Sequence, residues 1–126
     1  MKKVYKPTTA ELEILAVIWE RETATVREIF EVIGARKPTI YTTVLKTLQI
    51  MDEKGLVERD KTNRAHVYRA RIKQSDTGKQ ILRDVMQKVF GGSALKLVQQ
   101  VLETEATTAE DLREIRKMIR EVEKKA

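Results

Sequence analysis

The chain has 126 residues, a formal net charge of +6, no cysteine and one histidine, which fits one domain or a small domain with an appendage. Leu, Ile, Val and Phe supply 34 residues, above the roughly one-fifth below which a chain does not bury a core, so intrinsic disorder is excluded. The longest apolar run has six residues, against about 18 for a membrane span, and no apolar signal region follows Met1. We expect a cytoplasmic protein without disulfides, metal, other cofactor or membrane insertion.

The first two predicted helices each begin at a capping box, in which a Thr and a Glu three residues later bond each other's backbone N–H. Residues 8–11 read Thr-Thr-Ala-Glu and residues 25–28 read Thr-Val-Arg-Glu. Glu11 is predicted on a face away from the core, and residues 22–25 form at most a strand stub. Apolar side chains at helical spacing predict one buried stripe per helix: Leu12, Leu15, Ile18 and Trp19, then Val26, Ile29, Phe30 and Ile33.

The third predicted helix begins at about Pro38 or Thr39, because proline disfavours helical dihedrals in the residue before it. It ends at Lys54, ahead of Gly55, which is a typical residue after a helix C-cap. An apolar stripe runs along one face, and the N-terminal half of the opposite face holds short hydroxyls and one cation, with no acid. The stripe is Val44, Leu48 and Met51, and the opposite face is Thr39, Thr42, Thr43 and Lys46.

A β-hairpin is predicted next, because residues 56–61 and 66–71 are β-prone and flank a polar turn that contains Asn63 and Arg64. From residue 75 onward the pattern is helical, with Ser75 and Ser93 as expected N-caps and a third capping box at residues 107–110. The predicted fold is therefore mainly α with a small β-hairpin. It is a winged helix-turn-helix domain over residues 1–73, followed by a three-helix dimerisation lobe over residues 74–126.

Basic side chains concentrate in residues 36–73, which hold ten Lys or Arg and four Asp or Glu. Such a segment indicates either a polyanion site or an ordinary solvated surface, and charge alone does not separate the two. In a winged-helix context we favour double-stranded DNA, with the third helix in the major groove and the hairpin tip at a phosphate or in the minor groove. The predicted DNA-binding residues are Lys37, Thr39, Tyr41, Thr42, Thr43, Lys46 and Arg64. Tyr41 is ambiguous, because its ring can pack on the first helix while its hydroxyl reaches a phosphate.

The helical lobe carries more apolar surface than three short helices need for their own packing, so we expect a homodimer. The stripe on the last helix is too short for a stable coiled coil alone and needs a partner surface, although it could also pack within its own chain. The predicted dimer interface is Val85, Val89, Leu97, Val101, Leu112, Ile115, Ile119 and Val122.

No catalytic constellation is visible, so the chain is not expected to be an enzyme. Both serines fall at expected helix caps, and His66 has no acidic neighbour in sequence that could orient its ring. The five glycines match neither a phosphate-binding Walker loop nor a dinucleotide-binding fingerprint.

Several short motifs occur in a specific order: Ile-Tyr-Thr-Thr-Val at 40–44, Lys-Gly-Leu-Val at 54–57, Arg-Ala-His at 64–66 and Phe-Gly-Gly-Ser at 90–93. Together they resemble the penicillinase-repressor family, which includes repressors of β-lactamase and methicillin-resistance genes and a copper-responsive branch. The resemblance covers about the whole chain. It implies a homodimeric repressor at palindromic operators, controlling antibiotic-resistance or stress genes, with a recognition helix at 39–54 and a wing at 58–70.

The same resemblance implies regulation, and here the chain departs from the family. In the β-lactam branch a membrane sensor protease pathway leads to cleavage of the repressor, which would fall near Gln100 and Val101, but the Asn-Phe type pair is absent there. The copper branch uses C-terminal cysteines, which this chain lacks, so direct copper sensing is not expected. Family members usually carry Arg where this chain has Ile50.

Two other hypotheses stay open from the sequence. A winged-helix protein-interaction module without operator specificity is disfavoured by the basic segment and by the absence of acids at the start of the third helix. An RNA-binding winged helix is disfavoured because few aromatic side chains are available to stack on single-stranded bases.

Overall fold

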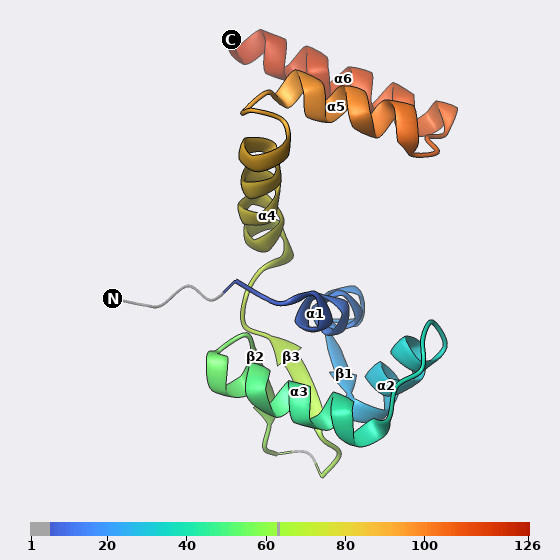
Figure 1. Ribbon diagram of the computed structural model, residues 1–126, viewed down its shortest axis with the longest axis vertical. Helices are drawn as coiled ribbons and strands as arrows, with labels where there is room; N and C mark the ends of the chain where they lie inside the picture. The colour runs from blue at the N-terminus through green and yellow to red at the C-terminus, as the bar shows by residue number, and fades with distance from the viewer. Residues whose placement is uncertain (1–5, 63) are drawn as a thin grey trace. The chain divides into compact units, whose positions relative to one another are not determined.

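The computed structural model describes residues 6–62 and 64–126 (Figure 1), so the predicted turn residue Asn63 lies outside the described residues. Contacts divide the chain into two compact units, one that ends at Lys79 and one that spans Gln80–Ala126, and each is described by itself. The first unit holds α1 (Thr9–Arg21), β1 (Thr23–Thr25), α2 (Val26–Gly34), α3 (Tyr41–Lys54), β2 (Val57–Asp60) and β3 (Val67–Ala70). Helix α4 (Gln74–Val89) crosses the division, and α5 (Ala94–Thr104) and α6 (Ala109–Lys125) follow.

Both capping boxes predicted in the first unit are confirmed. The Thr8 hydroxyl accepts the Glu11 N–H at 3.2 Å, and Glu11 Oε1 accepts the Thr8 N–H at 2.8 Å. The equivalent pair of bonds joins Thr25 and Glu28 at 3.0 and 2.9 Å. Each box satisfies N–H groups that a helix start leaves without an intrahelical partner.

The three strands form an antiparallel sheet in the order β1-β3-β2, so the hairpin strand β3 pairs with both others. Tyr68 at its centre lies opposite Ala24 of β1 and Arg59 of β2. Thr25 ends β1 and also caps α2, which joins the sheet directly to the second helix. The predicted class, mainly α with a winged helix-turn-helix and a small β element, is confirmed.

The core of the first unit lies where the stripes of α1, α2 and α3 meet the inner face of the sheet. Leu15, Ile18, Ile29, Leu48 and Met51 are fully buried there, as the helical spacing predicts. Trp19 packs at the edge of this cluster and donates its indole N–H to the Ile72 carbonyl at 3.0 Å.

Several predicted boundaries are wrong by one to three residues. Helix α3 begins at Tyr41 rather than at Pro38 or Thr39, because Ile40 is extended (φ −122°, ψ 152°) and serves as its N-cap. Ser75 lies inside α4 instead of capping it. Helix α6 is capped by Thr108 with Asp111, one residue later than predicted, whereas Ser93 caps α5 and Gly55 ends α3 at φ 81° as expected.

The second unit differs from the first in having no buried side chain. Residues 80–126 are all described, and each is exposed or half-buried. Exposed apolar side chains occur along α4, α5 and α6, with Val89 at 69% and Val122 at 68% exposure. Among the described residues, no helix combines the length and the apolar character that crossing a membrane requires.

Glu11 is buried, which corrects the prediction that it faces away from the core. Its side chain is 4% exposed, and Lys54 Nζ, at the end of α3, lies 2.9 Å from Glu11 Oε2. Burial raises the pKa of this carboxyl, but the Thr8 N–H and the hydrogen bond and charge of Lys54 outweigh burial, so the pKa is lowered. The ion pair therefore ties the first turn of α1 to the last turn of α3.

Lys54→Met is expected to lower the free energy of unfolding at pH 7 by about 1–3 kcal/mol, because it leaves a buried carboxylate short of a partner. A lowered native-state pKa stabilises the fold above the unfolded-state pKa, and this contribution is lost as the pH falls through the native value. The difference between wild type and variant should therefore shrink between pH 7 and about pH 3. Urea unfolding of both proteins at each pH, at one protein concentration, measures this difference in the free energy of unfolding.

Lys37→Met is the matched control, because Lys37 pairs with Glu13 at 2.8 Å in a more exposed setting. Exposed pairs contribute about 0–1 kcal/mol, so this variant should unfold close to wild type. Equal losses for the two variants would contradict the role given to the buried pair.

Candidate nucleic-acid interface

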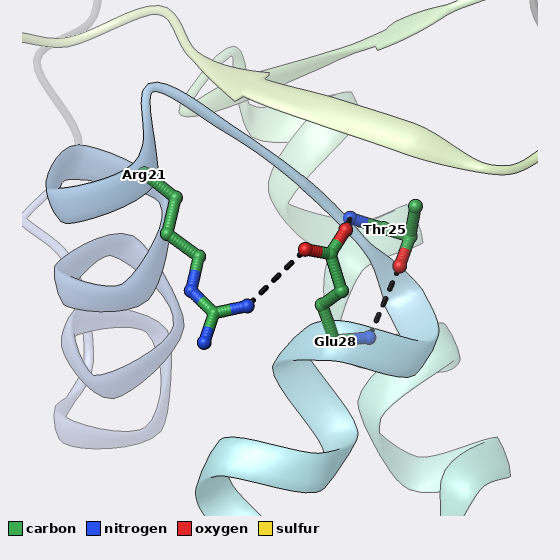
Figure 2. Close-up of polar contacts among 3 residues, drawn as sticks. All are labelled: Arg21, Thr25 and Glu28. Atoms are coloured by element: carbon green, nitrogen blue, oxygen red, sulfur yellow. Dashed lines mark hydrogen bonds and ion pairs between the residues drawn. The ribbon is translucent and has the colours of Figure 1, made fainter.

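The helix-turn-helix is built on a fixed junction between α1 and α2, which Figure 2 shows. One oxygen of Glu28 accepts the Thr25 N–H at 2.9 Å, and the other lies 3.2 Å from Arg21 Nη1 in the last turn of α1. The Thr25 N–H and hydroxyl lower the pKa of Glu28, and Arg21 adds a smaller effect in the same direction. Glu28 thereby stays ionised and joins the end of α1 to the start of α2.

Helix α3 presents its predicted outward face. Thr42, Thr43 and Lys46 are exposed on the side opposite the buried stripe, and no acidic residue lies in the first turn. Thr47, beside this face, donates its hydroxyl to the Thr43 carbonyl at 2.8 Å. The surface therefore offers hydroxyls and one ammonium group, which can meet phosphates and the acceptor edges of bases.

The ring of Tyr41 packs on Phe30 of α2, whereas the sequence-based prediction placed it against the first helix. Its ring makes an edge-to-face contact with Phe30, with 5.8 Å between the ring centroids. The residue as a whole is 38% exposed. The first residue of α3 is thus held against the preceding helix at the turn that joins them.

Lys37 and Thr39 lie on the connection between α2 and α3 rather than on the outward face of α3. Lys37 is paired with Glu13, and Thr39 is half-buried. Both border a hollow of about 90 Å³ that Thr43 also lines. The structure therefore places Thr42, Thr43 and Lys46 together and sets Lys37 and Thr39 at the edge of that group.

The wing carries Arg64 exposed in the loop between β2 and β3. Two other arginines of the hairpin are engaged by Glu58, which lies 2.6 Å from Arg69 Nε and 4.0 Å from Arg71 Nε. Asp60 accepts both the hydroxyl and the N–H of Thr62, which lowers its pKa and fixes the turn after β2. Unpaired positive charge in the described part of the wing therefore lies on Arg59, Lys61 and Arg64.

Gln49, which is not among the predicted DNA-binding residues, is exposed one helical turn beyond Lys46. Positions three apart are neighbours on a helix surface, so the helical period from Lys46 would have found it. A glutamine can donate to and accept from adenine in the major groove, so Gln49 extends the polar surface of α3.

The predicted dimer-interface residues all lie on α4, α5 and α6, where five are exposed and Leu97, Leu112 and Ile115 are half-buried. Gln100 and Val101, the predicted cleavage position, are exposed in α5.

The family model for penicillinase repressors matches residues 7–121. The chain belongs to the penicillinase repressor family. A methicillin resistance regulatory protein MecI from Staphylococcus aureus is 26% identical over 117 residues, covering 93% of this chain and 95% of its own. The penicillinase repressor of Bacillus licheniformis is 24% identical over 121 residues, covering 96% and 94%.

Comparison with a solved structure supports the fold of the first unit. The DNA-binding domain of the repressor BlaI matches with a TM-score of 0.52 and 29% identity, over 60% of this chain and 93% of that domain. From its family and its fold, the 126-residue chain is a DNA-binding transcriptional repressor with a winged-helix domain.

Proposed function

We propose that the protein represses transcription as a homodimer whose two winged-helix domains bind the two halves of a palindromic operator. The observation that carries the proposal is the absence of any buried side chain in residues 80–126, all of which are described. Helices with apolar stripes and no core of their own need a further surface to cover them. A second copy supplies that surface, so residues 74–126 act as the dimerisation domain and residues 1–73 as the DNA-binding domain.

The proposed interface uses the apolar residues that the sequence predicts, and their exposure supports it. Val89, Ile119 and Val122 are each more than half exposed in the single chain. In a twofold dimer the same patch on both copies becomes buried, so the apolar side chains of α4, α5 and α6 are removed from water together. The relatives' names point to β-lactam resistance genes as the class of target.

On DNA, the outward face of α3 enters the major groove and the wing contacts the backbone. Thr42, Thr43 and Lys46 reach base edges and phosphates from the N-terminal half of α3, the part of a recognition helix that contacts bases. Arg64 on the wing binds a phosphate or the minor groove. Lys37, Thr39 and Tyr41 flank this contact from the turn between α2 and α3.

We also propose that a cut at Gln100–Val101, downstream of a membrane sensor protease pathway, would relieve repression. Such a cut would separate the end of α5 and all of α6 from the rest of the chain, and with them five of the eight proposed interface residues. Operator affinity would then fall although the DNA-binding surface is unchanged.

The test of the proposed function uses the full chain and the duplex that it selects from a random-sequence pool. We expect a palindromic sequence, bound by two chains, with much weaker binding to a scrambled duplex and to RNA of the same sequence. Selection of no sequence would favour a protein-interaction module, and equal or tighter binding of the RNA would favour an RNA-binding winged helix. Either result would overturn the proposal.

Lys46→Ala and Thr43→Ala are expected to weaken the selected duplex more than the scrambled one, by about 1–3 kcal/mol if each contacts a base edge. Both side chains are exposed on α3, so neither change disturbs the core. Titration of both duplexes by fluorescence anisotropy measures the difference. Equal losses of affinity for the two duplexes would show that these residues contact the DNA backbone and do not read bases.

If Arg64 contacts only the backbone, Arg64→Ala is expected to weaken both duplexes to a similar extent, because a phosphate contact carries no sequence information. It should also reduce the slope of log affinity against log salt by about 0.9 for each phosphate that the arginine neutralises. Titrations at several salt concentrations measure the slope. An unchanged slope would show that Arg64 does not contact a phosphate.

A further inference from the structure

In the described part of the first unit, large apolar residues that are exposed by more than a third occur on one element only. All three belong to α3 or its N-cap: Ile40 at 62%, Ile50 at 39% and Tyr41 at 38%. Tyr41 has Phe30 as a ring partner, whereas Ile40 is the most exposed of the three. The apolar exposure of this unit thus lies on α3 and its N-cap, the element assigned to DNA.

Ile40 is held rigidly beside the outward face of α3. Its carbonyl accepts the Thr43 N–H at 3.1 Å and the Val44 N–H at 3.3 Å, which fixes its backbone to the first turn. Its β-branched side chain has restricted rotation about χ1. An exposed isoleucine with a fixed position loses little conformational entropy when a partner covers it.

Ile40 departs from the capping pattern of α1, α2, α5 and α6. Thr8, Thr25, Ser93 and Thr108 each accept a backbone N–H through their hydroxyl, whereas Ile40 provides no side-chain cap. Isoleucine is among the least favourable residues at an N-cap. Local rules that a sequence breaks without compensation inside the fold are typical of functional positions.

We propose that Ile40 contacts the C5 methyl group of a thymine in the major groove and is a specificity-determining residue of the operator contact. This inference rests on the proposed function. The thymine methyl is the apolar group that the major groove presents, and an isoleucine side chain can offer only apolar contact. Ile50 is an exposed isoleucine in the third turn of α3, ten residues after Ile40, so it controls for loss of apolar surface elsewhere on the same helix.

The experiment replaces each thymine of the selected duplex in turn with deoxyuridine, which removes only the methyl group. For the full-length wild type we expect one thymine in each half-site whose replacement weakens binding by about fourfold, the effect of removing one buried methyl group. Ile40→Ala should bind the thymine and deoxyuridine duplexes equally at that position. Ile50→Ala should keep the wild-type fourfold difference.

A further variant separates the contact from any effect on folding. Ile40→Ser restores a hydroxyl cap, so its thermal unfolding midpoint should rise above that of wild type, while its preference for thymine over deoxyuridine disappears. If Ile40→Ala or Ile40→Ser binds the selected duplex tightly and keeps the wild-type preference for thymine, the proposed Ile40 contact is wrong, while the operator function stands. Failure of the wild type to select any duplex would instead overturn the operator function, and the contact with it.

Discussion

A chain that ends at Lys79 is expected to lose at least about 100-fold in affinity for the full operator relative to the complete chain. Joining two DNA-binding domains makes the second binding event intramolecular, which raises affinity by about 10²–10⁴ without any new contact. Removal of residues 80–126 removes the proposed joint and leaves the contacts of α3 and the wing in place. Operator titration, with sedimentation to establish the number of chains, measures the effect.

The truncated chain is expected to stay folded, because the buried cluster from Ile14 to Tyr68 lies wholly within it. The BlaI DNA-binding domain, which matches 60% of this chain, is likewise a structure of that domain alone. A duplex with a single half-site is the control, and both chains should bind it about equally. If residues 1–79 bind the full palindrome as tightly as the complete chain, the dimer mechanism is wrong.

The double substitution Ile115→Asp and Ile119→Asp is expected to convert the proposed dimer into monomers and to weaken operator binding. Each carboxylate would be placed in the proposed apolar interface without a partner, which costs several kcal/mol. In the single chain Ile119 is 52% exposed and Ile115 is half-buried, so the change should leave the winged-helix unit folded. Sedimentation equilibrium measures the association constant.

The matched control is Ile115→Leu with Ile119→Leu, which keeps apolar character and helix propensity at both positions. This variant should remain dimeric and bind the operator as wild type does. A dimer that persists unchanged in the double aspartate variant would place the interface elsewhere on the chain.

Local sequence patterns predicted most of the first unit because their signals lie within a few residues. The boxes at Thr8 and Thr25 mark helix starts, and the predicted stripes of α1, α2 and α3 all pack in the core, although the α1 stripe left out the buried Ile14 and Val17. The start of α3 was missed by two or three residues because the restriction by Pro38 extends one residue back, whereas the extended Ile40 lies two residues forward. The box of α6 was misplaced because two consecutive threonines, each followed three residues later by an acid, fit the same pattern.

Long-range contacts could not be predicted in this way. The burial of Glu11 depends on Lys54, 43 positions away, and nothing in the surrounding sequence marks that pair. The contact of Tyr41 with Phe30 depends on how α2 and α3 cross. At the candidate site, helical spacing predicted the outward positions Thr42, Thr43 and Lys46 but did not show that Ile40 is the most exposed apolar residue near them.

The place of β3 between β1 and β2 has a consequence for how the protein is made. Pairing of Thr23 with Arg69 joins segments far apart in the chain, so β1 cannot enter the sheet before β3 has been synthesised. Closing such a long loop costs entropy that only non-local contacts repay, which makes it a slow step of folding. A nascent chain that has released α1, α2 and α3 from the ribosome therefore still lacks a finished DNA-binding surface. That surface is completed only when the hairpin emerges and β3, the central strand of the sheet, pairs with β1.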